Sequence, residues 1–144
     1  MTPYRHYRTG GLYTLVGEAF DADAQRLVVI YRPAGASPYK LFTRPKEEFF
    51  SAVDLGDGET TPRFRPVEIT VYGTETCPYC VKAKELLAQR GLDYTEVNVR
   101  EDERARELVY ELCDARGVKR TVPQIVIGHE HIGGYDDLRA FLAK

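Results

Sequence analysis

The sequence predicts two successive modules, a small mostly-β domain over residues 1–54 and an α/β domain over residues 67–144, joined by a linker at 55–66. Three observations lead to this fold class. Short apolar runs separated by Gly, Pro and Asp fill the first part of the chain. Strand-length and helix-length runs alternate in the second part, and two cysteines two residues apart lie where a strand passes into a helix.

The composition is that of an ordinary folded protein. The 144 residues are 43% hydrophobic and 29% charged, with a formal net charge of −2, which gives no reason to expect binding to nucleic acid or to a membrane surface. No apolar run approaches the ~20 residues of a membrane span, and the N-terminus lacks an apolar signal core. We therefore expect a cytoplasmic monomer whose three cysteines serve as one working dithiol and one spare thiol.

The first module is predicted to consist of short strands. A Gly10-Gly11 turn precedes a run of β-branched and aromatic residues, and the polar turn 21–25 and the breaker-rich loop 33–38 separate the runs that follow. The predicted elements are strands at 12–20, 27–31 and 41–44 and a short helix within 45–53. This pattern predicts a small SH3-like barrel.

A linker is predicted where Gly, Asp and Thr accumulate. Residues 54–62 are rich in these residue types and contain no periodic apolar pattern, as is typical of an exposed connection. We therefore place the linker at 55–66 and expect Phe64 to dock on the first module.

The second module is predicted to alternate between strands and helices. Gly91 is placed to end its first helix, and the acidic run 101–103 suits the N-terminus of its second. The predicted strands are 67–72, 94–99, 124–127 and 130–132, and the predicted helices are 78–90, 101–116 and 136–143. The resulting order is β-α-β-α-β-β-α, with the cysteine pair directly after the first strand.

The cysteine pair has the pattern of a redox-active dithiol. Cys77 is predicted at the helix N-terminus, where unpaired backbone N–H groups and the positive end of the helix dipole favour a thiolate. Pro78 suits the first helical position because it lacks an N–H group that the helix would not use. Cys80 lies deeper in the first turn, with less exposure and a higher expected pKa, so we interpret it as the thiol that resolves a mixed disulfide formed on Cys77.

Two other interpretations of the pair stay open: half of a zinc site, or two small core residues. A zinc site usually needs four ligands, and the other candidates lie at no zinc-finger spacing, so no metal is expected. Those candidates are Cys113, His6, His129 and His131. Cys113 is interpreted as a buried helix residue, and His129 and His131 as surface residues.

Three motifs give the second module a family resemblance. They are Cys77-Pro78-Tyr79-Cys80, Thr121-Val122-Pro123-Gln124-Ile125 and Gly133-Gly134-Tyr135-Asp136-Asp137-Leu138. On these motifs, residues 67–144 resemble a glutaredoxin, which implies a thioredoxin-like fold and glutathione as co-substrate. The resemblance also implies that Pro123 follows a cis peptide bond and lies against the cysteines.

The same resemblance implies a glutathione-binding site. The backbone of Val122 would pair with the cysteine moiety of glutathione like an added strand. Backbone N–H groups of Tyr135 and Asp136 would bind the γ-glutamyl carboxylate at a helix N-terminus, and the Asp136 side chain would cap that helix or meet the glutathione ammonium. The implied contact residues are Tyr79, Thr121, Val122, Pro123, Gly134, Tyr135 and Asp136.

Two positions depart from the family pattern. Many glutaredoxins have a lysine three residues before the first cysteine, where this chain has Thr74, and a small residue or a cysteine where it has Tyr135. The lysine supports the thiolate and binds the glycyl carboxylate of glutathione. Candidates to replace that cation are Arg116, Lys119 and Arg120.

Residues 4–53 resemble a small uncharacterised bacterial domain family. The matching features are Tyr4-Arg5-His6-Tyr7, Gly10-Gly11-Leu12-Tyr13, Val28-Val29-Ile30-Tyr31-Arg32 and Arg44-Pro45-X-X-X-Phe49. This resemblance implies no chemistry. The aromatic and basic residues of the module either line a binding surface or pack and solvate a small barrel.

These observations favour a dithiol glutaredoxin that reduces protein disulfides and glutathione mixed disulfides, with glutathione and client proteins as partners. An iron–sulfur cluster carrier using Cys77 from two subunits and two glutathiones is one alternative, disfavoured by the bulk of Pro78-Tyr79. A partner-binding protein with a regulatory dithiol is another. A thioredoxin-type enzyme reduced by a flavoprotein reductase is a further enzymatic variant.

Overall fold

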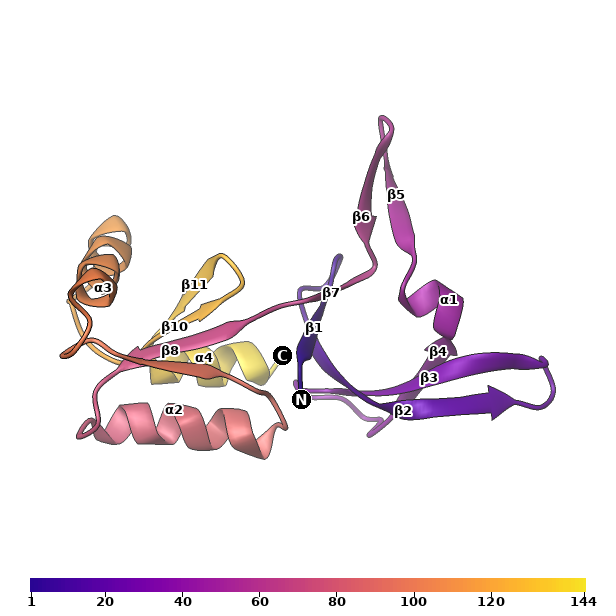
Figure 1. The fold of residues 1–144 in the computed structure, drawn as a ribbon, viewed down its shortest axis with the longest axis horizontal. Helices are drawn as coiled ribbons and strands as arrows, with labels where there is room; N and C mark the ends of the chain where they lie inside the picture. The colour runs from indigo at the N-terminus through magenta and orange to yellow at the C-terminus, as the bar shows by residue number, and fades with distance from the viewer. The chain divides into compact units, whose positions relative to one another are not determined.

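The computed structural model describes residues 1–144 and divides them into two compact units, Met1–Val67 and Glu68–Ala143. The first unit contains mainly strands, and the second combines strands with three helices (Figure 1). No helix is both long enough and apolar enough to cross a membrane. The mostly-β and α/β classes predicted for the two modules are confirmed.

The N-terminal unit is built on one antiparallel sheet of five strands in the order β4-β3-β2-β1-β7. These strands are β1 (Pro3–His6), β2 (Leu12–Asp21), β3 (Arg26–Pro33), β4 (Phe42–Pro45) and β7 (Phe64–Pro66). The guanidinium carbon of Arg44 on β4 lies 5.6 Å from the ring centre of Phe64 on β7. Side chains of the two edge strands therefore meet, but no backbone pairing joins β4 to β7, so closure of the sheet into an SH3-like barrel stays a prediction.

Aromatic rings form the core of this unit. The fully buried Phe49 lies in the one-turn helix α1 (Lys46–Phe49) and stacks on Phe64, with ring centres 4.1 Å apart and planes 6° from parallel. Tyr31 contacts both rings edge-on at 5.3 and 5.5 Å. Because Phe64 belongs to this cluster, its predicted docking on the first module is confirmed.

The predicted linker at 55–66 is wrong over most of its length, and the first domain does not end at residue 54. Strands β5 (Ala52–Gly56) and β6 (Glu59–Pro62) form a hairpin, and β7 pairs with β1 in the main sheet. Asp57 and Gly58 at the hairpin turn have φ values of 53° and 77°. Positive φ at both central residues is the geometry of a type I′ turn, for which Asp-Gly is a favoured sequence.

The C-terminal unit has a four-stranded mixed sheet in the order β11-β10-β8-β9, in which only β8 and β9 run parallel. Its strands are β8 (Ile69–Gly73), β9 (Thr95–Asn98), β10 (Gln124–Ile127) and β11 (Glu130–Gly133), and its helices are α2 (Pro78–Gln89), α3 (Glu103–Ala115) and α4 (Tyr135–Leu142). This is the predicted β-α-β-α-β-β-α order of a thioredoxin-like fold.

Helices cover both faces of this sheet. Helices α2 and α4 lie together on one side and α3 lies on the other (Figure 1). Val71 faces the first side and is fully buried, whereas its neighbour Tyr72 packs against the α3 cluster of Val109 and Cys113, as expected from the alternation of side chains along a strand. The prediction that Cys113 is a buried helix residue is therefore confirmed.

Candidate dithiol site

The two cysteines of the motif lie at the junction of β8 and α2. Cys77 is the N-cap residue of α2 and Pro78 its first helical residue, as predicted. The Cys77 sulfur accepts a hydrogen bond from the Cys80 backbone N–H at 3.4 Å. This contact places the partial positive charge of a helix N-terminal N–H group against the Cys77 sulfur.

The two thiols differ in exposure. Cys77 is partly exposed, whereas only 1% of Cys80 is accessible to solvent. Burial, reinforced by a hydrogen bond with the Cys77 side chain, raises the pKa of the Cys80 thiol to about 11. The prediction that the second thiol is the less exposed one is confirmed.

The loop before β10 places its backbone against Cys77. The Val122–Pro123 peptide bond is cis, as the family resemblance implied, and the Cys77 thiol donates to the Val122 carbonyl oxygen at 3.5 Å. An ideal Cβ on Gly134 would lie 3.6 Å from the Pro123 carbonyl oxygen, so Gly134 lies against the same loop. The second and third motifs therefore meet at the first.

Two aromatic rings lie close together at the N-termini of α2 and α4. Tyr79 in the first turn of α2 and Tyr135 at the start of α4 have ring centres 6.2 Å apart. The Lys82 ammonium lies 5.0 Å from the Tyr79 ring centre, and the Arg139 guanidinium carbon 5.8 Å from that of Tyr135. Each ring is thus paired with a cation, which is favourable at an exposed site.

The start of α4 requires one correction. Of the two roles anticipated for Asp136, capping the helix is wrong, because Asp137 Oδ2 accepts from the Gly134 N–H at 2.9 Å. The exposed Asp136 carboxylate instead lies 3.5 Å from the Arg139 guanidinium. A Cβ on Gly133, where φ is +123°, would overlap the Asp137 carboxylate, so this cap requires glycine there.

Gln124 and His131 support the Thr121–Pro123 loop, and neither role was anticipated from the sequence. The buried Gln124 donates to the Thr121 carbonyl at 2.9 Å, and its Oε1 atom lies 2.7 Å from His131 Nε2. Surface placement holds for the exposed His129 but is wrong for His131, which is only partly accessible. Burial, reinforced by the positive charge of Arg116, lowers the pKa of His131.

Of the three candidate cations near this loop, only one has no hydrogen-bond or ion-pair partner. Arg116 donates to the backbone carbonyls of His131 and Ile132 at 3.1 and 3.0 Å, and Arg120 forms two hydrogen bonds with Asp114 at 3.0 and 2.8 Å. Lys119 is exposed and has no ion-pair or hydrogen-bond partner. The structure contains no group of three or more side chains arranged to hold a metal ion.

The fold and the site together define a thioredoxin-fold protein with an accessible cysteine, a buried second cysteine and a cis-proline loop beside them. The family models narrow this class. The model described as Glutaredoxin matches residues 69–132, and the model described as Protein of unknown function (DUF1653) matches residues 2–66.

Individual proteins match each part of the chain. A Pseudomonas aeruginosa protein named Glutaredoxin is 44% identical over 72 residues, which cover 50% of this chain and 81% of that protein. A buckwheat glutaredoxin–glutathione complex is 28% identical with a TM-score of 0.45, covering 53% of this chain and 76% of its own. A DUF1653 protein from Bordetella bronchiseptica is 31% identical with a TM-score of 0.39, covering 44% of this chain and 81% of its own.

The chain belongs to the glutaredoxin family through its C-terminal unit, which is a thiol–disulfide oxidoreductase of that type. Its N-terminal unit is a DUF1653 domain, so the resemblance of the first module to an uncharacterised family is also confirmed.

Proposed function

We propose that this protein reduces protein disulfides and glutathione mixed disulfides, using glutathione as the source of electrons. The observation that carries the proposal is the asymmetry of the dithiol. Cys77 is accessible at a helix N-terminus beside the Val122 backbone, whereas Cys80 is buried and has a pKa of about 11. Cys77 is thus suited to attack a disulfide, whereas Cys80 stays protonated as a thiol.

In the proposed monothiol route, the Cys77 thiolate attacks the glutathione sulfur of a mixed disulfide. The client–glutathione S–S bond breaks, the client leaves as a thiolate that takes a proton from water, and a Cys77–glutathione disulfide forms. The thiolate of a second glutathione then attacks that disulfide. Oxidised glutathione leaves, and Cys77 returns to the thiolate form.

In the proposed dithiol route, Cys77 forms a mixed disulfide with a client protein, and Cys80 resolves it. Cys80 loses its proton and attacks the Cys77 sulfur, so the client leaves reduced and a Cys77–Cys80 bond closes. Two glutathiones restore the dithiol and leave as oxidised glutathione. Because burial keeps Cys80 protonated near neutral pH, we expect the monothiol route to be faster when the substrate is a glutathione mixed disulfide.

The proposed glutathione site follows the groups around Cys77. The Val122 backbone pairs with the cysteine moiety of glutathione, and the first N–H groups of α4, at Tyr135 and Asp136, bind the γ-glutamyl carboxylate. Asp136 is free of a capping role and faces the glutathione ammonium, and Lys119 supplies the cation for the glycyl carboxylate. Tyr79, Thr121, Pro123 and Gly134 complete the walls.

We further propose that the protein acts as a monomer in the cytoplasm. The monothiol route consumes one free glutathione per cycle and the dithiol route consumes two, so the reaction needs a compartment with a reduced glutathione pool.

The test is glutathione-dependent reduction of a small mixed disulfide, coupled to glutathione reductase, for wild type, Cys77→Ser, Cys80→Ser and Cys113→Ser. We expect activity to be lost in Cys77→Ser and retained in Cys80→Ser, with Cys113→Ser as the control for a thiol outside the site. Absence of activity in wild type, combined with turnover by thioredoxin reductase, would show that electrons do not come from glutathione.

A further inference from the structure

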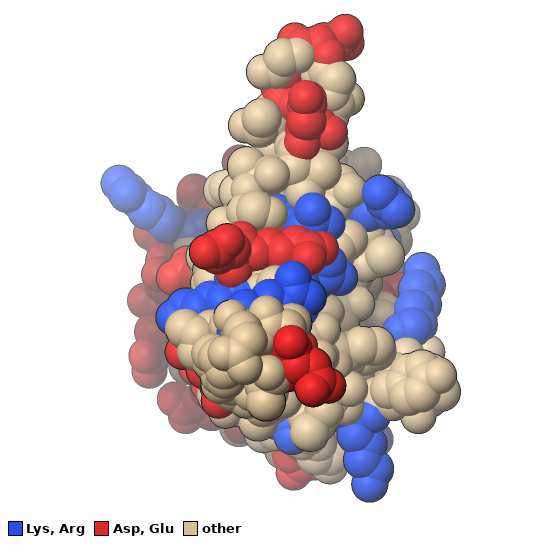
Figure 2. Space-filling model, turned by 90° about the vertical axis from the view of Figure 1, so that its right-hand side faces the viewer, with Lys and Arg blue, Asp and Glu red and all other residues tan.

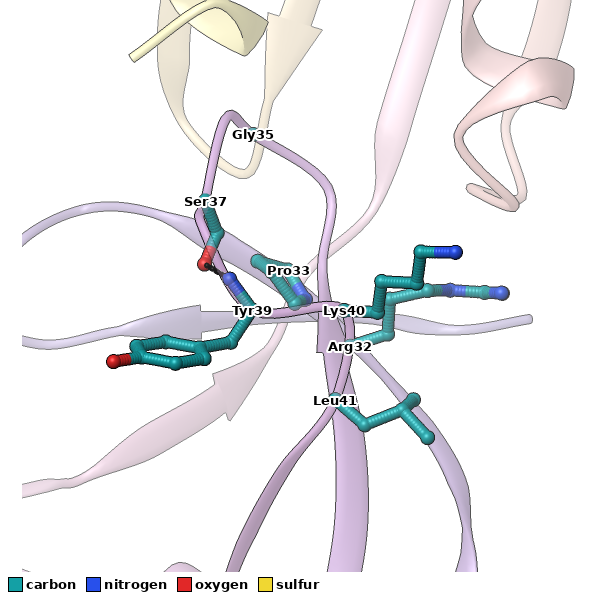
Figure 3. Close-up of a pocket in the computed structure, with 7 residues that line it drawn as sticks. All are labelled: Arg32, Pro33, Gly35, Ser37, Tyr39, Lys40 and Leu41. Carbon is teal, nitrogen blue, oxygen red and sulfur yellow. Dashed lines mark hydrogen bonds between the residues drawn. The ribbon is translucent and has the colours of Figure 1, made fainter.

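The N-terminal unit has a pocket of its own, with a volume of about 440 Å³, where β3 ends and the loop to β4 begins. Arg32 and Pro33 line it from the end of β3, and Tyr39, Lys40 and Leu41 line it from the loop (Figure 3). This volume lies within the ~300–1,000 Å³ range of ligand-binding pockets.

The pocket carries positive charge that nothing in the domain neutralises. Residues 31–46 include four cations and no acidic residue. Arg44 is paired with Glu48 and Lys46 with Glu18, both within 2.8 Å. The remaining two, Arg32 and Lys40, are exposed, have no ion-pair partner, and line the pocket together.

The acidic residues of the domain lie elsewhere. Figure 2 shows acidic side chains gathered at the projecting end of the β5–β6 hairpin, which carries Asp54, Asp57 and Glu59. Since no Asp or Glu is among the pocket-lining residues, Arg32 and Lys40 are available to an anionic group of another molecule.

The loop that forms the pocket is held in place at both ends. Ala34 donates its N–H to the Leu12 carbonyl of β2 at 2.8 Å, and the Tyr39 ring packs edge-on against Phe42 of β4 with centres 6.1 Å apart. Between these points, the Ser37 hydroxyl accepts from the Tyr39 N–H at 3.1 Å. A loop fixed before binding loses little conformational entropy when a ligand arrives, which favours affinity.

The placement of the side chains favours an extended ligand. Figure 3 shows Arg32 and Lys40 extending side by side with Leu41 below them, whereas the Tyr39 ring extends to the opposite side of the loop. Tyr39 and Leu41 are 66% and 52% exposed, so both offer apolar surface. A small anion reaches only the two cations, whereas a peptide that crosses the loop reaches the cations and Tyr39 together.

We propose that this pocket binds an acidic segment of polypeptide, with carboxylates against Arg32 and Lys40 and apolar side chains against Leu41 and Tyr39. This segment belongs to a disulfide-containing or glutathionylated client, which the DUF1653 domain recruits for the dithiol. This assignment of the client rests on the proposed function.

Direct binding tests the pocket without any thiol chemistry. The probe is a fluorescein-labelled, cysteine-free peptide with a run of Glu flanked by Leu and Tyr, and its control peptide has Gln in place of each Glu. Anisotropy titrations of the full chain at low ionic strength are expected to show binding of the Glu peptide at least ~10-fold tighter than the Gln peptide, a ratio that falls as salt screens the charges.

Two matched charge variants locate the site. Arg32→Gln/Lys40→Gln is expected to weaken Glu-peptide binding ~10-fold, whereas Arg26→Gln/Arg65→Gln, with the same change of net charge on the same domain, is expected to change it less than ~2-fold. Circular dichroism and the thermal midpoint confirm that each variant is folded. The proposal would be overturned if the two double variants lost Glu-peptide affinity equally, or if the Glu and Gln peptides bound equally well. Binding of citrate without binding of the Glu peptide would also overturn it.

Turnover separates this inference from the proposed function. With a glutathionylated acidic peptide as substrate, the Arg32→Gln/Lys40→Gln variant is expected to have a KM raised ~5-fold or more, with its activity on a small mixed disulfide unchanged. If glutathione supports no turnover but the Glu peptide still binds, the proposed function fails and the peptide-binding pocket stands. An unchanged KM for the acidic substrate contradicts recruitment.

Discussion

The Nε2 atom of His131 lies 2.7 Å from Oε1 of Gln124, and this contact connects β11 to the first residue of β10, directly after the loop whose Val122 carbonyl contacts Cys77. A carbonyl oxygen only accepts hydrogen bonds, so Nε2 carries the proton and Nδ1, which is buried without a partner, does not. The amide nitrogen of Gln124 is then aimed at Thr121, where it donates to the carbonyl and hydroxyl oxygens at 2.9 and 3.3 Å.

Replacing Gln124 with Met is therefore expected to loosen the Thr121–Pro123 loop while filling a similar volume. The KM for glutathione should rise ~5- to 10-fold, because Val122 no longer presents its backbone in a fixed position. Steady-state kinetics with varied glutathione measures the effect. The control is His129→Asn, at an exposed position two residues before His131, which should leave the KM for glutathione unchanged. An equal rise in KM in that control would contradict the role of Gln124.

Gly73→Ala is expected to destabilise the protein by ~1–3 kcal/mol. An ideal Cβ at this position would lie 2.6 Å from the Cys80 sulfur, which is fully packed, so either the strand or the thiol must move. Chemical denaturation measures the loss. Gly17→Ala is the matched control, because no atom lies within 4 Å of its Cβ position.

The double variant Gly73→Ala/Cys80→Ala tests the stated cause. Removing the sulfur leaves only the Cys80 Cβ at 3.3 Å from the new methyl group. Adding Gly73→Ala to the Cys80→Ala protein should therefore cost less free energy of unfolding than adding Gly73→Ala to wild type. Additive losses would mean that the close approach to the thiol is not the reason for glycine at this position.

Closure of the Cys77–Cys80 bond is expected to accelerate with pH. Burial raises the pKa of Cys80 to about 11, so the fraction present as the attacking thiolate grows ~10-fold for each pH unit between 7 and 9. The measurement is release of glutathione from a preformed Cys77–glutathione disulfide, without added thiol, as a function of pH. Cys80→Ser should show no release, and a pH-independent rate in wild type would contradict the raised pKa.

Lys119→Ala is expected to raise the KM for glutathione ~3- to 10-fold with little change in kcat, because an uncommitted cation contributes to binding and not to bond cleavage. Arg120→Ala is the comparison within the same loop. Its guanidinium is occupied by Asp114, so its removal should have the smaller effect. The reverse order would assign the glycyl carboxylate to Arg120.

The parts of the site that follow from local rules were predicted from the sequence. Cys77 as N-cap, Pro78 at the first helical position and the buried Cys80 follow from helix geometry, and the cis bond before Pro123 follows from the family motif. The capping residue was misassigned by one position, because Asp136 and Asp137 are adjacent and only the backbone turn at Gly133 and Gly134 decides which carboxylate reaches the N–H.

Interactions between residues far apart in the sequence were not predictable in the same way. Strand β7 is three residues long, too short for a periodic pattern, and it exists because Phe64 enters the aromatic core and its backbone pairs with β1. The Asp57-Gly58 pair is a local sequence signal for the turn of the β5–β6 hairpin. The polar residues around it are more typical of a linker, so the hairpin was not predicted. No pattern in the sequence indicates that Gln124 and His131 meet.

Acidification is expected to destabilise the C-terminal unit through His131. Burial, then the charge of Arg116, lowers the pKa of this imidazole below 6.5, and together they outweigh the attraction of Asp137. A group whose pKa is lower in the folded than in the unfolded state favours folding above its unfolded pKa, and that contribution is lost as the pH falls through the folded value. Protonation would place a second N–H at the buried Nδ1 position, where no acceptor is available.

Thermal unfolding at pH 7.5 and pH 5 measures this effect. The drop in midpoint between the two pH values should be larger in wild type than in His131→Asn by at least ~2 °C, because asparagine does not titrate. His6 also has a pKa lowered by burial, so His6→Asn reports how much of the drop in midpoint comes from the N-terminal unit. His129 is exposed, so His129→Asn is the control. An identical drop in wild type and His131→Asn would show that protonation of His131 does not oppose folding.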